Sequence, residues 1–283
     1  MLLAALFLLL LPQSGVERIT IAPANADTAQ LSKAIAPRVT FRSNVASATR
    51  APWVDSNGWR YLRQPDGHFY CDAPGAVAAT LAAAEAFAYG VHVAIHTDDA
   101  GLGPLNKMLA FLHDAKGDDF SPLVNIGFVD DGSAESGEFM NLLVRRNLLF
   151  KVVKQPDPKL DLNVTPGSAE YPKSEAANPS LLAEKVRANL TDAKRLLRIY
   201  GSEVVVGRLV ESGNTERLYL INYGVARSPA HGVRVRVLGT FTKQQAEQFD
   251  SAETKLMDVS TDSGATEFTL PELKTFAMIN LAK

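Results

Sequence analysis

The chain has 283 residues but a single cysteine, Cys71, and this scarcity excludes several classes of protein. One thiol cannot form an internal disulfide, and it cannot supply a cysteine-based structural zinc site. A catalytic thiol would need a nearby base and a lowered pKa. Cys71 lies in an aromatic segment and not at a strand-to-helix elbow, so we do not expect it to be a nucleophile.

A charge excess of either sign is also absent. The chain has 29 Lys and Arg residues against 31 Asp and Glu residues, which gives a formal net charge of -2. A nucleic-acid partner would call for a clustered basic surface, so we expect none. The length and the hydrophobic content of 46% instead suit roughly two globular domains with substantial cores.

The motifs of several common enzymes are missing. The sequence contains no G-x-S-x-G elbow, no P-loop, no H-E-x-x-H and no G-x-G-x-x-G after a predicted strand. These absences argue against the common serine-hydrolase, nucleotide-binding and zinc-protease sites. We therefore predict neither a cofactor nor a metal site.

The apolar run at residues 1–12, MLLAALFLLLLP, is too short to span a bilayer as a stable helix. It resembles the hydrophobic region of a signal peptide, with the small residues Ser14 and Gly15 close to a cleavage point. The usual basic residues before that region are missing, and a hydrophobic helix packed on the domain is the alternative. We predict a signal peptide over residues 1–15, a secreted or periplasmic protein, and no membrane span in the mature chain.

The clearest pattern that is present is a strand–helix–strand unit in residues 124–153. Residues 124–129 form an apolar run of the kind found in a strand buried on both faces. Ser133 is a good N-cap for the helix that follows, and residues 148–153 read as the next strand. Such a unit crosses over right-handed, so its two strands pair in parallel.

Polar residues follow this first strand and also follow a second predicted strand at residues 91–95. Ligands in open parallel sheets bind beyond the carboxyl ends of the strands, and two such clusters on neighbouring strands would share one crevice. The same residues also serve as helix caps, which is the interpretation that we favour. The candidate ligand-binding residues here are His96, Asp99, Asp131 and Ser133, and the candidate catalytic carboxylates are Asp98 and Asp130.

Residues 50–70 contain both tryptophans, Trp53 and Trp59, with the polar residues Asp55 and Asn57 among them. Aromatic rings interleaved with such polar groups are typical of sugar sites, because the ring stacks on the apolar sugar face. Large aromatic residues are more often structural, so both rings could equally fill core gaps. We retain Trp53, Asn57 and Trp59 as candidate ligand contacts and Asp55 as a candidate carboxylate.

Other local patterns give further expectations. The turn signal Asp66-Gly67 predicts a β-hairpin between Tyr61 and Phe69. Residues 76–89 form an Ala-rich helix stopped by Gly90, and we expect Glu85 on its solvent face. A short helix is expected between Asp27 and Pro37.

The pattern changes in the second half of the chain. Prolines and mixed charge over residues 165–179 predict a domain boundary, and Asn178-Pro179 begins a helix. From residue 203 onward the hydrophobic period is two, which indicates an antiparallel sandwich. We therefore predict an α/β domain over residues 16–165, with an open, mostly parallel sheet flanked by helices. A helix and a small antiparallel β-sandwich follow over residues 166–283.

The segments IGFVDDGS (126–133) and LLVRRNLLFKVV (142–153) resemble the glutamine-amidotransferase-like α/β domain of glycoside hydrolases, of the β-galactosidase trimerisation type. The segment from IYGSEVVVGRL to KTFAMINL (199–281) looks like the small β-sandwich that follows it, so the resemblance covers about residues 123–283. It implies a carbohydrate-related, exported bacterial protein. The amidotransferase nucleophile is typically lost in that family, and here no cysteine follows a strand in this region. A catalytic barrel of roughly 250 residues does not fit, so the family's catalytic carboxylates cannot be assigned.

Three functions follow from these observations. The first is a non-catalytic carbohydrate-associated or assembly protein, with a carbohydrate ligand and a homo-oligomer or partner protein as candidate associations. The second is a glycoside hydrolase that uses a carboxylate pair drawn from Asp55, Asp98 and Asp130. The third is a structural surface protein without a small-molecule site. The sequence leaves open whether the protein is an enzyme.

Overall fold

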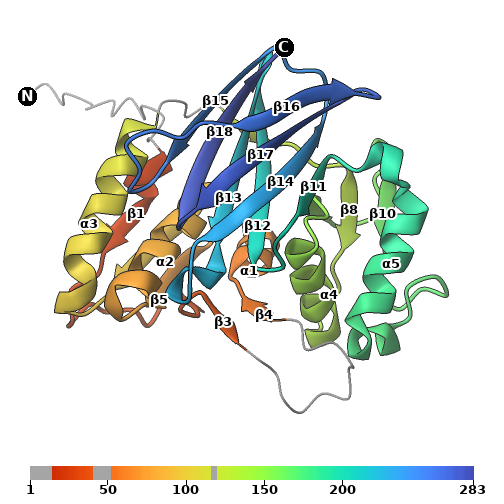
Figure 1. The fold of residues 1–283 in the computed structure, drawn as a ribbon. Coiled ribbons are helices and arrows are strands. Elements are labelled where there is room, and N and C mark those ends of the chain that lie inside the picture. Colours follow the sequence, from red (N-terminus) through yellow and green to blue (C-terminus); the bar gives the residue numbers. More distant parts are fainter. Residues whose placement is uncertain (1–14, 41–51, 116–119) are drawn as a thin grey trace, which may run out of the picture.

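The computed structural model describes residues 15–40, 52–115 and 120–283, so residues 1–14 of the predicted signal peptide lie outside the described ranges. A β-sandwich lies across one side of a layer of helices and short parallel strands (Figure 1). The mixture of parallel and antiparallel sheets that the sequence predicts is confirmed. Within the described ranges, no helix has the length and apolar character that a membrane crossing needs.

The first parallel sheet has four strands, in the order β1 (Ile19–Ile21), β6 (His92–His96), β5 (His68–Asp72) and β2 (Ser32–Ala34). Two helices follow its strands, α2 (Gly75–Tyr89) after β5 and α3 (Asp99–Asp114) after β6. The helix α2 ends where Gly90 adopts φ +66°, a left-handed conformation that favours glycine. The predicted Ala-rich helix is thus confirmed. The short helix expected before Pro37 is wrong, because a turn leads there into β2.

The second parallel sheet has three strands, in the order β10 (Leu162–Val164), β8 (Ile126–Val129) and β9 (Phe150–Val153). The predicted strand–helix–strand unit is confirmed: α4 (Ala134–Arg145) connects β8 to β9, and the Ser133 side chain accepts a hydrogen bond from the Ser136 N–H (3.2 Å). The helix α5 (Pro179–Leu190) packs against α4. Its predicted cap, Asn178, accepts from the Leu181 N–H (3.3 Å).

The parallel strands therefore form two sheets, and the prediction of one open sheet is wrong. A short helix, α1 (Gly58–Arg63), lies between them and contacts α2 on one side and α4 and β9 on the other. It also replaces the predicted hairpin from Tyr61 to Phe69. The physical reason is aromatic burial: the helical backbone places the buried Tyr61 ring 4.8 Å from the Phe69 ring and leaves Trp59 facing α4.

The predicted antiparallel sandwich is confirmed. One sheet has the order β11 (Leu197–Tyr200), β14 (Ala230–Leu238), β17 (Ala265–Leu273) and β16 (Met257–Asp262). The other has the order β15 (Lys243–Gln248), β18 (Phe276–Ala282), β13 (Thr215–Asn222), β12 (Val205–Ser212) and β7 (Ser121–Pro122). A hairpin of β3 (Arg38–Thr40) and β4 (Trp53–Asp55), and the 3₁₀ turns η1 (Gly15–Arg18), η2 (Lys173–Ala177), η3 (Asp192–Lys194) and η4 (Tyr223–Ala226), complete the described elements.

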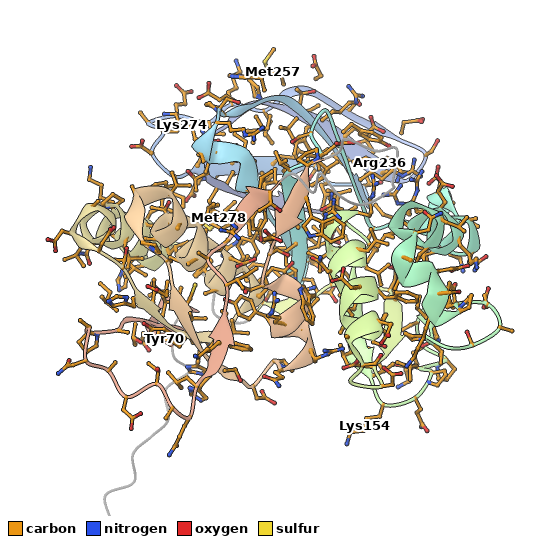
Figure 2. The ribbon with its side chains drawn as sticks, turned by 90° about the horizontal axis from the view of Figure 1, so that it is seen from below. Tyr70, Lys154, Arg236, Met257, Lys274 and Met278 are labelled. Atoms are coloured by element: carbon orange, nitrogen blue, oxygen red, sulfur yellow. The ribbon has the colours of Figure 1, made fainter. Side chains whose placement is uncertain are left out.

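One hydrophobic core runs from the α/β layer into the sandwich. The ring of Phe87 in α2 meets the rings of Tyr219 (5.7 Å between centroids) and Phe276 (6.4 Å) from β13 and β18. In the view from below (Figure 2), Met278 lies where the two layers meet, whereas Met257 lies on the outer side of the sandwich. The two layers thus bury apolar surface against each other. The predicted domain boundary at residue 165 stays a prediction.

The shared core predicts that the two layers unfold together. Replacing Phe276→Ala should lower the free energy of unfolding by about 3–5 kcal/mol, because it opens a cavity among buried rings. Urea denaturation followed by fluorescence and by circular dichroism should then give a single coincident transition. Met257→Ala, at a half-exposed site on β16, is the control and should cost within about 0.5 kcal/mol. Two separate transitions in the wild type would contradict the shared core.

Candidate functional site

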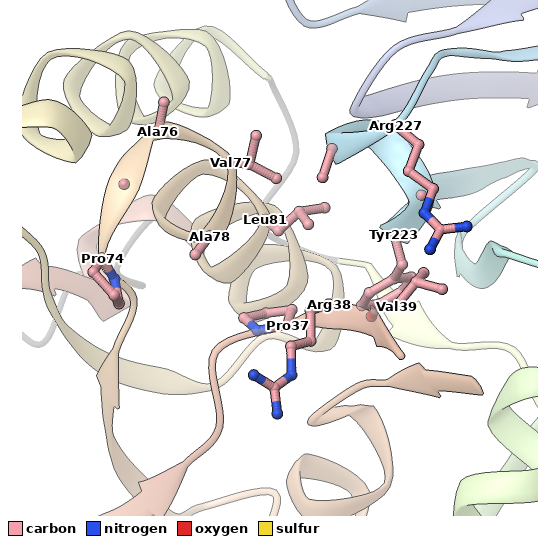
Figure 3. Close-up of a pocket in the computed structure, with 13 residues that line it drawn as sticks. Pro37, Arg38, Val39, Pro74, Ala76, Val77, Ala78, Leu81, Tyr223 and Arg227 are labelled. Carbon is pink, nitrogen blue, oxygen red and sulfur yellow. The ribbon is translucent and has the colours of Figure 1, made fainter. Parts of the chain in front are cut away.

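An apolar cavity of about 400 Å³ lies between α2, β3 and η4. Residues 74–78 and Leu81 form its α2 side, and residues 37–39 form its β3 side. Tyr223 and Arg227 close it from the sandwich (Figure 3). The α2 and β3 walls begin just after β5 and β2, at the carboxyl ends of parallel strands, where α/β proteins bind ligands.

A buried hydrogen-bond network fixes the wall of this apolar cavity. Glu85, from the middle of α2, accepts hydrogen bonds at Oε1 from the Tyr223 hydroxyl (2.6 Å) and the Asn57 N–H (2.7 Å). Its Oε2 accepts from the Asn57 side-chain amide (2.9 Å). The same Asn57 side chain also bonds both backbone groups of Ile35 (2.9 and 2.8 Å). One carboxylate thus ties α2, the start of α1, the chain before β3 and the sandwich together.

The expectation that Glu85 faces solvent is wrong, because its exposed fraction is 0%. Burial raises the pKa of the Glu85 carboxyl, and the hydrogen bonds from Tyr223 and Asn57 partly oppose that rise. A buried carboxylate is tolerated when donors satisfy its oxygens, and here three donors do so. The Ala-rich sequence of α2 gave no sign of these partners.

Two more cavities continue from the apolar cavity, one after the other. A linking cavity of about 290 Å³ shares Val39, Gly224 and Arg227 with it. The linking cavity in turn shares Pro52, Gly201 and Ser202 with a third cavity of about 500 Å³, the arginine pocket, which is bounded by the end of α4, α5 and β11. We call the three cavities together the groove. It is elongated and changes from apolar to positively charged along its length.

The residues at the end of β8 are held by protein partners. Asp130 accepts two hydrogen bonds from the Arg63 guanidinium (both 2.8 Å). Asp131 lies 2.6 Å from the Lys173 ammonium and accepts from the Ser136 hydroxyl (2.6 Å). Hydrogen bonds from Lys173 and then from Ser136 lower the pKa of the Asp131 carboxyl. Ser133 is the N-cap of α4. These contacts give each of the three candidates a structural partner.

The residues at the end of β6 are also engaged. The Asp98 side chain caps α3 by accepting from the Gly101 N–H (2.9 Å), and it accepts from the Gly75 N–H (2.9 Å) as well. His96 Nδ1 lies 2.9 Å from Asp72 Oδ1, and Asp99 is exposed in the first turn of α3. Since β6 and β8 belong to different sheets, the prediction that the two clusters end neighbouring strands is wrong.

The aromatic candidates pack against arginines. The Arg145 guanidinium lies 3.8 Å from the centre of the Trp53 ring, and Arg60 lies 4.3 Å from that of Trp59. Such cation–π contacts stabilise the folded chain and occupy one face of each ring. Neither tryptophan lines the three cavities of the groove. Their role as ligand contacts stays a prediction.

The polar candidates beside them differ in position. Asp55 pairs with Arg38 (3.5 Å), which lines the apolar cavity, and Asn57 is buried in the Glu85 network. Asp55 and Asn57 therefore support the wall of the apolar cavity from behind, and neither of them lines it. Sequence reasoning missed Tyr223, whose one local signal is the turn Asn222-Tyr223-Gly224 after β13. That turn does not reveal which helix it packs against.

The environment of Cys71 and the grouping of possible metal ligands bear on two further kinds of chemistry. Cys71 is fully buried and donates to the Ile35 carbonyl (3.3 Å). Burial raises the pKa of the Cys71 thiol to about 12, so the reactive thiolate is scarce at neutral pH. Within the part of the chain that the structure describes, no three His, Cys, Asp or Glu residues are grouped to hold a metal ion.

The chain is similar to known enzymes in structure but not in sequence. No protein-family model and no curated protein sequence matches it. Alpha-L-fucosidase isoenzyme 2 from Paenibacillus thiaminolyticus superimposes with a TM-score of 0.60 at 11% sequence identity, over 79% of this chain. The fold is glycoside-hydrolase-like. The match spans 62% of the fucosidase chain.

Two further matches are weaker. The beta-galactosidase from Bacillus circulans sp. alkalophilus has a TM-score of 0.44 at 9% identity, over 80% of this chain and 61% of its own. The apo exo-carrageenase from Bacteroides ovatus has a TM-score of 0.36 at 10% identity, over 81% of this chain and 44% of its own. The fucosidase likeness confirms a glycoside-hydrolase-like fold. The relation to amidotransferase-like domains stays a prediction.

The capping role of Asp98 predicts the effect of its replacement. Asp98→Ala should lower the free energy of unfolding by about 0.5–2 kcal/mol, because the first turn of α3 loses its acceptor. Asp98→Asn keeps an oxygen that can cap the helix and should recover most of that loss. Thermal and urea denaturation measure both. Equal losses for the two variants would contradict the capping role.

The Glu85 network predicts a dependence on pH. The pKa of Glu85 is higher in the folded chain than in the unfolded chain. The stability that this group contributes is therefore fully present below the ordinary glutamate pKa, and it is lost as pH rises through the folded pKa. Tyr223→Phe removes a donor to the charged form and raises the folded pKa further, so its cost should grow as pH rises. At high pH the cost should reach about 1.5–3 kcal/mol, the range for a hydrogen bond to a charged group.

Urea denaturation at a series of pH values measures this cost. The matched control is Tyr171→Phe, which removes a buried hydroxyl that accepts from the Asn189 amide (2.8 Å). The loss in free energy of unfolding caused by Tyr171→Phe should not increase with pH. A cost of Tyr223→Phe that stays constant across the same range would contradict the account of Glu85.

Proposed function

We propose that this chain is a non-catalytic carbohydrate-binding protein that holds a sugar chain in the groove. The observation that carries this proposal is the chemistry of the groove lining. Among the described residues that line its three cavities, Glu203 is the one carboxylate. A groove lined by a single carboxylate favours the binding of a sugar chain over its hydrolysis.

Glycoside hydrolases in most families need two carboxylates that flank the scissile bond, at separations of roughly 5 to 10 Å. The three carboxylates proposed from the sequence are Asp55, Asp98 and Asp130, and none of them lines the groove. Asp130 forms a two-pronged ion pair with Arg63, and Asp98 caps a helix. These roles in the fold weigh against the hydrolase alternative.

The apolar cavity has the mixture of groups that a sugar ring requires. Ala76, Val77 and Ala78 of α2 offer aliphatic surface to the apolar face of a sugar, and Arg38 and Arg227 line the same cavity. Tyr223 is buried and its hydroxyl is held by Glu85, so the cavity wall is supported from behind before a ligand arrives. A binding surface that is ordered in advance loses less entropy on binding.

The glycoside-hydrolase-like fold supports the same proposal, since it relates the chain to proteins that act on sugars. The signal-peptide pattern of residues 1–12 fits a secreted or periplasmic protein, and a protein outside the cytoplasm encounters polymeric sugars. Assembly with a partner protein or with a second copy of the chain remains part of the proposal.

A binding assay tests the proposal. Isothermal titration calorimetry with a panel of neutral and charged oligosaccharides should detect binding of at least one class to the wild type. Val77→Trp, at an exposed position on the cavity wall, should weaken that binding by about tenfold or more by filling the apolar cavity. Leu102→Trp, at an exposed site on α3 outside the groove, is the matched control and should bind as the wild type does.

Two results would overturn the proposal. Absence of binding across the whole panel would remove the carbohydrate ligand. Release of reducing sugar from a bound oligosaccharide, abolished by Asp130→Asn or Asp98→Asn, would instead establish the hydrolase.

A further inference from the structure

The arginine pocket gathers positive charge from three separate elements. Its cavity of about 500 Å³ lies at the end of the groove opposite the apolar cavity. Glu203 is the single carboxylate among its described lining residues. The five arginines that line it are Arg145 and Arg146 from the end of α4, Arg187 from α5, and Arg195 and Arg198 from η3 to β11.

Two of these arginines are largely buried, and Arg198 donates to the Asp192 carbonyl and to the Tyr200 hydroxyl (3.5 Å). The Arg195 and Arg198 side chains are 12% and 16% exposed, and the Nε atom of each is buried without a hydrogen-bond partner among the described residues. Both guanidinium groups share one nearby carboxylate, Asp192, at 3.7 and 3.4 Å. The Asp192 side chain is 65% exposed, and one carboxylate neutralises one charge. A surplus of positive charge therefore remains beside the cavity.

Mutual repulsion adds to the cost of this arrangement. Burial lowers the pKa of Arg195, and the neighbouring charges of Arg187 and Arg198 lower it further. A guanidinium nevertheless stays protonated in a protein, so these like charges persist at every physiological pH. An anion bound between them would relieve the repulsion and satisfy the buried N–H groups.

Helix stability explains only part of the cluster. Cations at the end of α4 interact favourably with the helix dipole, which accounts for Arg145 and Arg146. Arg145 also donates to the Pro52 carbonyl (3.1 Å) and stacks on Trp53. The same dipole effect accounts for Arg187 in the last turn of α5, but it does not account for Arg195 and Arg198, which reach the cavity from η3 to β11.

We propose that the arginine pocket binds the oxyanion substituents of an acidic carbohydrate, such as sulfate esters or uronate carboxylates. Guanidinium groups form paired hydrogen bonds with such oxyanions, which gives both strength and orientation. The linking cavity, which shares Pro52 and Ser202 with the pocket, would let one sugar chain reach from the apolar cavity to the arginines. This inference rests on the proposed function and names the class of its ligand.

The test compares a sulfated galactan oligosaccharide, its desulfated counterpart and an oligogalacturonate by isothermal titration calorimetry. The wild type should bind at least one of the two acidic ligands about tenfold or more tightly than the neutral one, and added salt should reduce this difference. The double variant Arg146→Gln with Arg187→Gln should lose that preference and still bind the neutral ligand. The matched control is Lys107→Gln with Lys255→Gln, which removes the same charge at exposed sites outside the pocket and should keep the preference.

The two proposals fail in different ways. Equal affinity for acidic and neutral oligosaccharides would overturn the acidic ligand and leave carbohydrate binding intact. Binding of inorganic sulfate or phosphate without binding of any oligosaccharide would overturn both the carbohydrate ligand and this inference. A preference for acidic ligands that survives in the arginine variant would overturn the assignment to this pocket.

Discussion

The buried carboxylate of Glu85 is the constraint on which the rest of the structure depends. An ionisable group inside an apolar helix is costly unless donors surround it, and the chain supplies Asn57 and Tyr223 for this purpose. Those donors come from segments on either side of the apolar cavity. Satisfying one charge therefore fixes the distance between the α/β layer and the sandwich. The apolar cavity lies beside this contact, since Tyr223 also borders it.

The remainder of the architecture follows from this contact between layers. Rings from α2, β13 and β18 seal the interface behind Glu85, so the layers share a core. The short helix α1 begins directly after Asn57 and separates the two parallel sheets. Its Arg63 then holds Asp130 at the end of β8. Asp130, which the sequence suggests for catalysis, thus helps to hold the fold together, and it does not line the groove.

Features set by neighbouring residues were predictable from the sequence. The caps at Ser133 and Asn178, the stop at Gly90 and the period-two strands of the sandwich depend on local chemistry, and all are confirmed. Features set by distant partners were not. The hydroxyl that binds Glu85 lies 138 residues away along the chain, and no local pattern reveals such a pairing. The groove, which joins β3, α2, η4 and β11, was missed for the same reason.

The central claim is that a sugar chain lies in the groove between the layers, from the apolar cavity to the arginine pocket. A crystal structure of the protein with a bound oligosaccharide tests it most directly. The account predicts electron density for sugar rings beside Val77, continuing past Ser202 toward Arg195. Density confined to the ends of β6 and β8, around Asp98 and Asp130, would contradict the account and restore the carboxylate-based site.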